Sequence, residues 1–169
     1  MIRDILSIFA NAASDKNLIY WLDSSSLVQS SYGLVSNTTD VNICINSLDE
    51  YDFLDMRYDL EQYKLHIQSH EGGYKIVPAL QFKSSHETDI CSQRIDGDNL
   101  SDIPSINILI IEENNNRTYY RNNYLNVKWP NHYHLTKDLY PLKYYKLYGL
   151  TVSGPNNPIP YINRAYKTM

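Results

Sequence analysis

Apolar and polar positions follow two different periods along this chain, and each period predicts its own kind of element. Apolar residues recur three and four apart between Ile2 and Ala13, which predicts an amphipathic helix over residues 2–15. Serine caps predict two shorter helices, over 26–32 and 48–57, and a closing helix is expected over 161–166. Short apolar or alternating runs predict strands over 18–23, 41–45, 63–68, 74–80, 106–111 and 147–152.

The order of these elements predicts an α+β fold with a small mixed sheet flanked by helices. Residues 71–73 (Glu-Gly-Gly) read as the turn of a hairpin between two of the strands, and residues 106–111 form the most apolar strand, expected at the centre of the sheet. Residues 83–104 are polar and predict a long loop. No repeat or linker divides the chain, so residues 1–169 are expected to form a single domain.

Composition narrows the class of protein. The chain has 169 residues, of which 43% are hydrophobic and 20% charged, so it supports an ordinary core and excludes a disordered or coiled-coil protein. Its net charge of −4 argues against a general nucleic-acid binder. No apolar run approaches the ~18 residues of a membrane span, and residues 1–4 do not open a signal peptide, so a cytoplasmic location is expected, in a host cell or virion if the source is viral.

Tyrosine is unusually frequent, with 16 residues against three Phe and two Trp. One interpretation is an AT-rich genome, such as that of a microbe or a large DNA virus. The other is a tyrosine-lined contact surface, because tyrosine combines apolar area with a polar tip. Eight of the tyrosines lie between Tyr119 and Tyr148, a clustering that coding bias does not explain. This cluster favours a binding module with a protein partner or a second copy of the chain.

Cysteine and histidine chemistry is sparse. Cys44 and Cys91 form no CxxC pair, which excludes a zinc ribbon and a thioredoxin-type motif and leaves a single bridge between them as an alternative to free thiols. His132 and His134 could bind a metal together from one face of a strand, but without a third ligand they read as solvent-exposed loop histidines. No nucleophilic triad can be assembled.

Three sets of segments, in order along the chain, resemble one known family. Residues 20–27 (YWLDSSSL) and 39–43 (TDVNI) are similar to the opening motifs of the LicD/fukutin family. Its closing motifs are resembled by residues 139–143 (LYPLK), 147–152 (LYGLTV) and 155–162 (PNNPIPYI). The resemblance implies a nucleotidyltransferase fold and the transfer of phosphocholine or phospho-alditol groups from CDP-activated donors to sugar hydroxyls.

The positions that would carry this chemistry have changed in the chain. The resemblance places the family's three acids at Asp40, Asn42 and Asn107, so two carboxylates are amides here. Ser25 stands in place of the glycine of the phosphate turn, and Tyr32 in place of an arginine. Ser25 and Ser26 read either as helix caps or as phosphate ligands, and Lys143 occupies the position of a family lysine.

Two hypotheses follow from these changes. In the first, the chain is a degenerate, catalytically inactive domain that needs no cofactor and acts as a binding or assembly module, because hard cations are held chiefly by carboxylates. In the second, it is an active transferase that uses Mg²⁺ or Mn²⁺ on Asp40 and a cytidine nucleotide as donor. That alternative needs a substitute acid, for which the candidates are Asp23, Asp102, Glu112 and Glu113.

Overall fold

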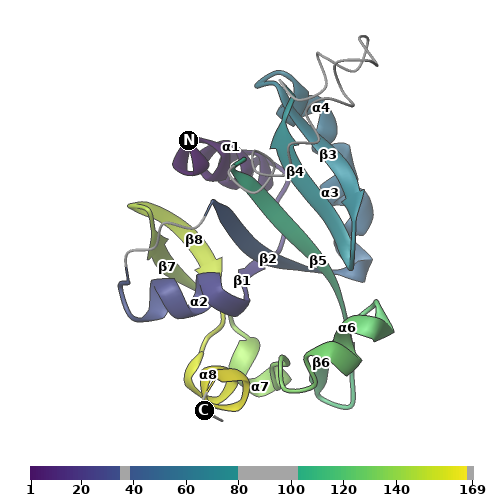
Figure 1. Cartoon of the computed structure of the whole chain (residues 1–169), viewed down its shortest axis with the longest axis vertical. Helices are drawn as coiled ribbons and strands as arrows, with labels where there is room; N and C mark the ends of the chain where they lie inside the picture. Colours follow the sequence, from purple (N-terminus) through teal and green to yellow (C-terminus); the bar gives the residue numbers. More distant parts are fainter. Residues whose placement is uncertain (35–38, 80–102, 167–169) are drawn as a thin grey trace.

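The structure of the protein, a computed structural model, describes residues 1–34, 39–79 and 103–166 (Figure 1). It confirms the mixed α+β class with a small mixed sheet flanked by helices. Within the described residues, the main sheet has six strands in the order β1-β2-β5-β4-β3, with β6 paired to the far end of β5. These strands are β1 (Trp21–Leu22), β2 (Asp40–Asn46), β3 (Leu65–His70), β4 (Gly73–Pro78), β5 (Ser105–Asn114) and β6 (Arg117–Tyr120).

Strands β2 and β5 form the centre of the sheet and run parallel, while every other pairing in it is antiparallel. Their register sets Asp40 beside Ser105 and Asn42 beside Asn107. Parallel neighbours in register point their side chains to the same face. The pairing therefore brings residues 65 positions apart in the sequence into one row.

Helices cover the sheet and gather at one end of it. They are α1 (Ile2–Asp15), α2 (Ser24–Ser31), η1 (Ser47–Asp49), α3 (Glu50–Asp55), α4 (Arg57–Glu61), α6 (Asn123–Lys128), α7 (Thr136–Leu139) and α8 (Ile159–Tyr166). Helix α1 packs against β2, β5 and α4. A separate hairpin of β7 (Lys143–Leu147) and β8 (Leu150–Gly154) lies beside α2 and β1. Figure 1 shows β6, α6, α7 and α8 together at the lower end of the molecule.

The two faces of the central strands differ in polarity. Val41, Ile43 and Ile45 of β2 alternate into the main core, where Phe9 of α1 and three isoleucines of β5 join them: Ile106, Ile108 and Ile110. The opposite face of β2 carries Asp40 and Asn42, then buried Cys44, which packs in a second cluster around Trp21, and it ends at Asn46. A polar patch therefore lies on the sheet between two packed regions.

Most predicted elements are confirmed, with several corrected boundaries. The helix over 2–15, the strands at 41–45 and 106–111, the hairpin across 71–73 and the closing helix all form. The strand over 18–23 shortens to two residues, the helix over 26–32 begins two residues earlier, and the helix over 48–57 divides into η1, α3 and α4. Residues 83–102 of the predicted loop and the Cys91 thiol lie outside the described residues, and Cys44 is a buried free thiol.

The strand predicted over 147–152 is wrong, because this segment contains a turn. Tyr148 and Gly149 both have positive φ, 51° and 76°, and they reverse the chain between β7 and β8. Positive φ at two adjacent residues is the backbone geometry of a tight hairpin turn. The apolar run was therefore two strand ends joined by a turn. Among the described residues, no helix is long and apolar enough to cross a membrane.

A substitution at Gly73 tests how closely the hairpin of β3 and β4 approaches β5. A Cβ at Gly73 would lie 2.1 Å from the backbone oxygen of Ile108, an atom that cannot move without disturbing the sheet. We expect Gly73→Ala to lower the free energy of unfolding by about 3 kcal/mol in urea titrations. Gly33→Ala is the control, because Gly33 has positive φ but open space around it, and it should cost only about 1 kcal/mol. Equal losses in the two variants would contradict this packing.

Candidate functional site

A cavity of about 440 Å³ opens on the polar face of β2 and β5. Its walls come from the start of α2, the turn between β3 and β4, helix α6 with the loop after it, and the end of α8. The lining residues are Ser24, Ser25, Asn42, His70, Glu71, Asn107, Leu109, Leu125, Trp129, His132 and Tyr166. The cavity thus combines hydroxyl, amide and imidazole groups with an apolar wall.

Asp40, Asn42 and Asn107, the three positions singled out from the sequence, meet on this face, and Asn42 and Asn107 line the cavity. The Asn107 Nδ2 group donates to Asn42 Oδ1 at 3.0 Å and lies 3.4 Å from Asp40 Oδ2. The Asn107 Oδ1 atom is buried and has no hydrogen-bond partner among the described residues. These three side chains, which we call the amide row, join β2 to β5 through one amide nitrogen.

The first turn of α2 ties the amide row to the helix. Ser26 is buried and its hydroxyl accepts a hydrogen bond from the backbone N–H of Asn42 at 2.8 Å. The Ser25 hydroxyl accepts from Asn42 Nδ2 at 3.1 Å. Both serines therefore hold α2 against β2, and a phosphate-binding role for them stays a prediction. The structure does not bring Lys143 to the cavity, since it lies on β7 with Nζ 5.4 Å from the centre of the Tyr145 ring.

The amide row does not fit a divalent cation. Such a cation needs several oxygen ligands, preferably carboxylates. Here an N–H group points at the two oxygens that would have to share the metal, and one carboxylate is present where the resemblance implied three. In the described ranges, no group of three or more His, Cys, Asp or Glu side chains is placed to hold a metal ion.

The substitute acids are engaged elsewhere or not described. Asp23 is buried and paired with His134, on the inner side of the α2 start. Glu113 accepts hydrogen bonds from Asn46 Nδ2 at 2.8 Å and from the Tyr140 hydroxyl. Glu112 is exposed and, like Glu113, does not line the cavity, and Asp102 lies outside the described residues.

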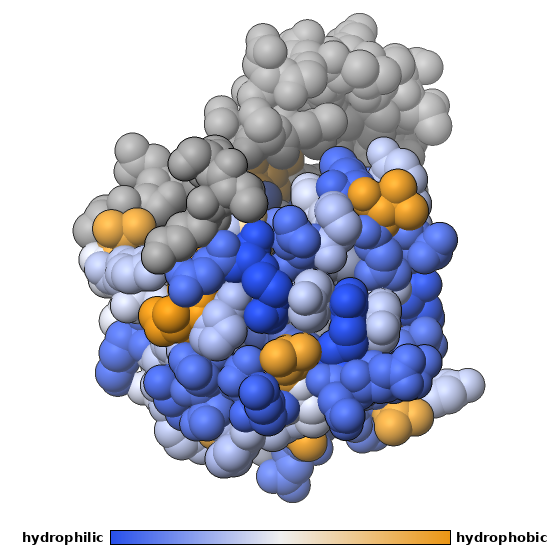
Figure 2. Space-filling model, turned by 90° about the horizontal axis from the view of Figure 1, so that it is seen from below, coloured by the Kyte–Doolittle hydropathy of each residue, from blue (hydrophilic) through white to orange (hydrophobic). Residues whose placement is uncertain are grey.

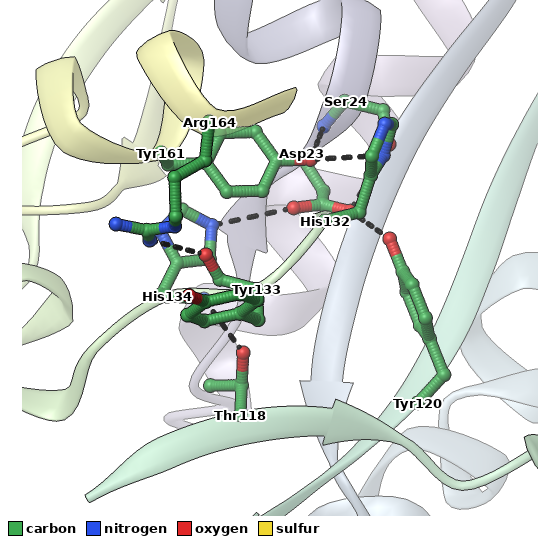
Figure 3. A network of polar contacts seen from close by, with 9 residues as sticks. All are labelled: Asp23, Ser24, Thr118, Tyr120, His132, Tyr133, His134, Tyr161 and Arg164. Atoms are coloured by element: carbon green, nitrogen blue, oxygen red, sulfur yellow. Dashed lines mark hydrogen bonds and ion pairs between the residues drawn. The ribbon is translucent and has the colours of Figure 1, made fainter. Parts of the chain in front are cut away.

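A buried pair of Asp23 and His134 lies beside Ser24, one of the residues that line the cavity (Figure 3). The Nε2 atom of His134 lies 3.3 Å from Asp23 Oδ1, and both side chains are almost fully buried. Asp23 Oδ2 accepts hydrogen bonds from the Tyr120 hydroxyl at 3.0 Å and from Ser24 Oγ at 3.1 Å. Burial alone would raise the pKa of Asp23, but the hydrogen bond and charge of His134, with the Tyr120 hydroxyl, hold that pKa below its usual value.

Tyr161 of α8 connects this ion pair to the cavity. Its ring stacks on His134 at 4.2 Å between centroids, with 8° between the planes. Its hydroxyl accepts from the Ser24 backbone N–H and lies 3.4 Å from His132 Nδ1. Ser24 and His132 both line the cavity, so the buried pair positions two parts of its wall. Partial burial lowers the pKa of His132, which favours its neutral form.

The expectation of two solvent-exposed loop histidines is therefore wrong. His134 is buried because the backbone on either side of it pairs with β6: its N–H donates to the Thr118 hydroxyl, and its carbonyl accepts from the Thr118 N–H. His132 is half-buried and stacks on Trp129. The His-x-His spacing and the acid that ends the Trp-Leu-Asp strand were visible in the sequence, but 111 positions separate Asp23 from His134, and no local pattern joins them.

Comparisons with known proteins give one sequence relative and a likeness of fold. No family model matches the chain. The uncharacterized protein RP689 of Rickettsia prowazekii (strain Madrid E) is 28% identical over 152 residues, which are 89% of this chain and 48% of that protein. The chain thus spans about half the length of that relative.

Two solved structures of ANT(2'')-Ia are similar in fold. A crystal structure of that protein in complex with adenylyl-2''-tobramycin shares 10% identity, with a TM-score of 0.48 over 91% of this chain and 68% of that one. A solution structure of the same antibiotic-resistance factor shares 9% identity, with a TM-score of 0.49 over 90% of this chain and 63% of that one.

These findings overturn the expected membership of the LicD/fukutin family. No model of that family matches, and the structures that resemble the chain are of the aminoglycoside nucleotidyltransferase ANT(2'')-Ia. The residues that suggested the family are largely packing residues: Trp21 centres the second core cluster, Tyr140 packs on it, and Tyr161 supports the α2 start. Packing residues of this kind report how a chain folds, and they do not establish a family.

The Asp23–His134 pair gives a test of how the site is held. Asp23→Ala should lower the free energy of unfolding by about 4 kcal/mol, because it leaves a buried imidazole without its partner. Tyr120→Phe, which removes one hydrogen bond from the carboxylate, should cost about 1.5–3 kcal/mol.

The pH dependence of that loss follows from the lowered pKa of Asp23. A carboxyl group whose pKa is depressed by folding contributes stability above its unfolded pKa, and the contribution disappears as pH falls through the folded pKa. The stability gap between the native chain and Asp23→Ala should hold at pH above the ordinary value of 3.8 and narrow below it. Urea unfolding measured from pH 6 to pH 2 checks this, and a gap that widens on acidification would contradict it.

Proposed function

We propose that this chain is a non-catalytic binding module whose cavity takes a small polar ligand without a metal-bound phosphate group. One observation carries the proposal: the Asn107 side-chain amide donates hydrogen bonds to both Asp40 Oδ2 and Asn42 Oδ1. A metal-dependent transferase would need carboxylates around a cation at this point. The site is held together by amide hydrogen bonds, and its described residues supply one carboxylate to that row.

A divalent cation and a general base contribute so much to catalysis that their loss favours a binding role over a catalytic one. A divalent cation in a transferase neutralises diphosphate charge and contributes several kcal/mol of transition-state stabilisation. Losing a general base costs about 10²–10⁴ in rate on its own. The alternative of an active Mg²⁺- or Mn²⁺-dependent transferase with a cytidine nucleotide needs a second carboxylate beside Asp40, and Asp23, Glu112 and Glu113 do not provide one at this cavity.

The lining of the cavity indicates the chemistry of its ligand. None of the lining residues is Lys or Arg, and Glu71 contributes a carboxylate, so the walls do not favour a polyanion. The buried, unpaired Asn107 Oδ1 atom can accept a hydrogen bond from a ligand hydroxyl or amine. Leu109, Leu125 and Trp129 offer apolar contact beside it. A neutral or cationic molecule with hydroxyl or amino groups matches this arrangement.

Calorimetric titration of the native chain tests the proposed binding. The probes are hexoses, hexosamines and nucleosides without metal, and CTP with Mn²⁺. We expect at least one phosphate-free probe to bind, and Asn107→Leu to weaken it by about tenfold, because that variant removes the buried acceptor. Lys143→Gln is the control and should bind normally. Micromolar CTP binding that requires Mn²⁺ and disappears in Asp40→Ala would overturn the proposal.

Restoring the acids gives an independent test of the amide row. In the double variant Asn42→Asp, Asn107→Asp, three carboxylates would crowd together, so Tm without metal should fall by several degrees. Millimolar Mn²⁺ should recover at least that loss, while it leaves the native chain unchanged. The charge-matched control Asn11→Asp, Asn163→Asp lies on exposed helical positions and should show neither effect. A native chain stabilised as strongly as the double variant would contradict the account.

A further inference from the structure

Two arginines from distant segments share one aromatic ring. The guanidinium carbon of Arg117, at the start of β6, lies 3.7 Å from the centre of the Tyr133 ring, and that of Arg164, on α8, lies 4.2 Å from it. These distances to one ring centre place the two guanidinium carbons no more than 7.9 Å apart. Arg117 also lies over the ring of Tyr119, at 4.2 Å.

The two arginines carry charge that the described residues do not neutralise. An aromatic ring attracts and orients a cation but has no net charge. Within the described ranges, no carboxylate lies at ion-pair distance from Arg117 or Arg164, whereas the guanidinium nitrogens of Arg121 lie 2.7 and 2.9 Å from the Glu50 oxygens. The Nε atoms of Arg117 and Arg164 are both buried and lack a hydrogen-bond partner in the described part of the chain.

The arginine side chains are held in place without an anion. Figure 3 shows Arg164 reaching from α8 to Tyr133, where its Nη2 donates to the Tyr133 carbonyl at 2.6 Å. The backbone of Arg117 forms a bridge with Leu135, two residues beyond Tyr133. Both cations are thus fixed relative to each other by backbone pairing and by the shared ring. Such preorganisation reduces the entropy that a ligand must overcome on binding.

We propose that Arg117, Tyr133 and Arg164, which we call the arginine pair site, bind a phosphate group. A phosphate or phosphate monoester carries up to two negative charges and several acceptor oxygens, so it can bridge two guanidinium groups that a singly charged carboxylate would serve less well. None of the three residues lines the cavity, so this site is separate from the proposed ligand site. The end of the molecule that carries β6 and α8 is mostly hydrophilic, with small scattered apolar patches (Figure 2).

Phosphate titration of the native chain tests the site directly. The Arg Nε–H signals of a ¹⁵N-labelled chain are followed as sodium phosphate replaces sodium chloride at constant ionic strength and pH. We expect the Arg117 and Arg164 signals to shift and to reach saturation at millimolar phosphate. The affinity for acetate should be less than a tenth of the affinity for phosphate. Glycerol 3-phosphate, run in parallel, shows whether an ester or the free ion binds more tightly, and either ranking supports the site.

Substitutions separate anion binding from a purely structural role. Arg117→Gln and Arg164→Gln should each weaken phosphate binding at least about tenfold, and Arg117→Lys, which keeps the charge, should weaken it less. Arg57→Gln is the matched control, because Arg57 stacks on the ring of Tyr58 and no second arginine of the described residues shares that ring, and it should bind phosphate normally. Arg Nε–H signals that do not respond to phosphate in the native chain, or binding retained in both glutamine variants, would overturn the proposal.

Discussion

The core and the cavity floor are both built on the parallel pairing of β2 with β5. Its register buries Ile43 and Ile108 on one face and sets Asn42 beside Asn107 on the other, so the same hydrogen-bonded ladder builds the core and the floor of the cavity. A shift by one residue would exchange the two faces and bury the amides. The Asn107 amide strengthens this register from the polar side, because it joins both strands through side chains.

The buried Asp23–His134 pair extends this order to the elements around the sheet. It holds the start of α2, β6, the segment before α7 and, through Tyr161, helix α8. Breaking such a pair is costly because the remaining polar group would then stay buried without its partner. The same contacts position Ser24 and His132 in the cavity wall. Tyr133 lies between the two histidines in sequence, and its ring contacts Arg117 and Arg164. One network therefore supports two separate candidate binding sites.

The sequence predicted the strands and the convergence of distant positions better than it predicted what surrounds them. The resemblance to the LicD/fukutin family implied that Asp40, Asn42 and Asn107 lie together, and the structure does bring them together although the family membership is wrong. The burial of His134 and the isolation of Lys143 from the cavity depend on tertiary contacts that no local pattern encodes.

The tyrosine cluster is only partly a contact surface, for the same reason. Tyr120 is a buried hydrogen-bond donor and the ring of Tyr133 contacts an arginine, whereas Tyr144 is exposed. The turn at Tyr148 and Gly149 has only the glycine as its sequence signal, because the positive φ of Tyr148 is not typical of tyrosine.

We propose that amide hydrogen bonds, without a cation, organise the polar face of the sheet. The most direct measurement is the paramagnetic broadening by Mn²⁺ of the side-chain NH₂ signals of Asn42 and Asn107 in the native, ¹⁵N-labelled chain. The account predicts that these signals broaden no more than those of exposed asparagines such as Asn11 and Asn163 as Mn²⁺ is added. Selective loss of the Asn42 and Asn107 signals at micromolar Mn²⁺ would contradict it.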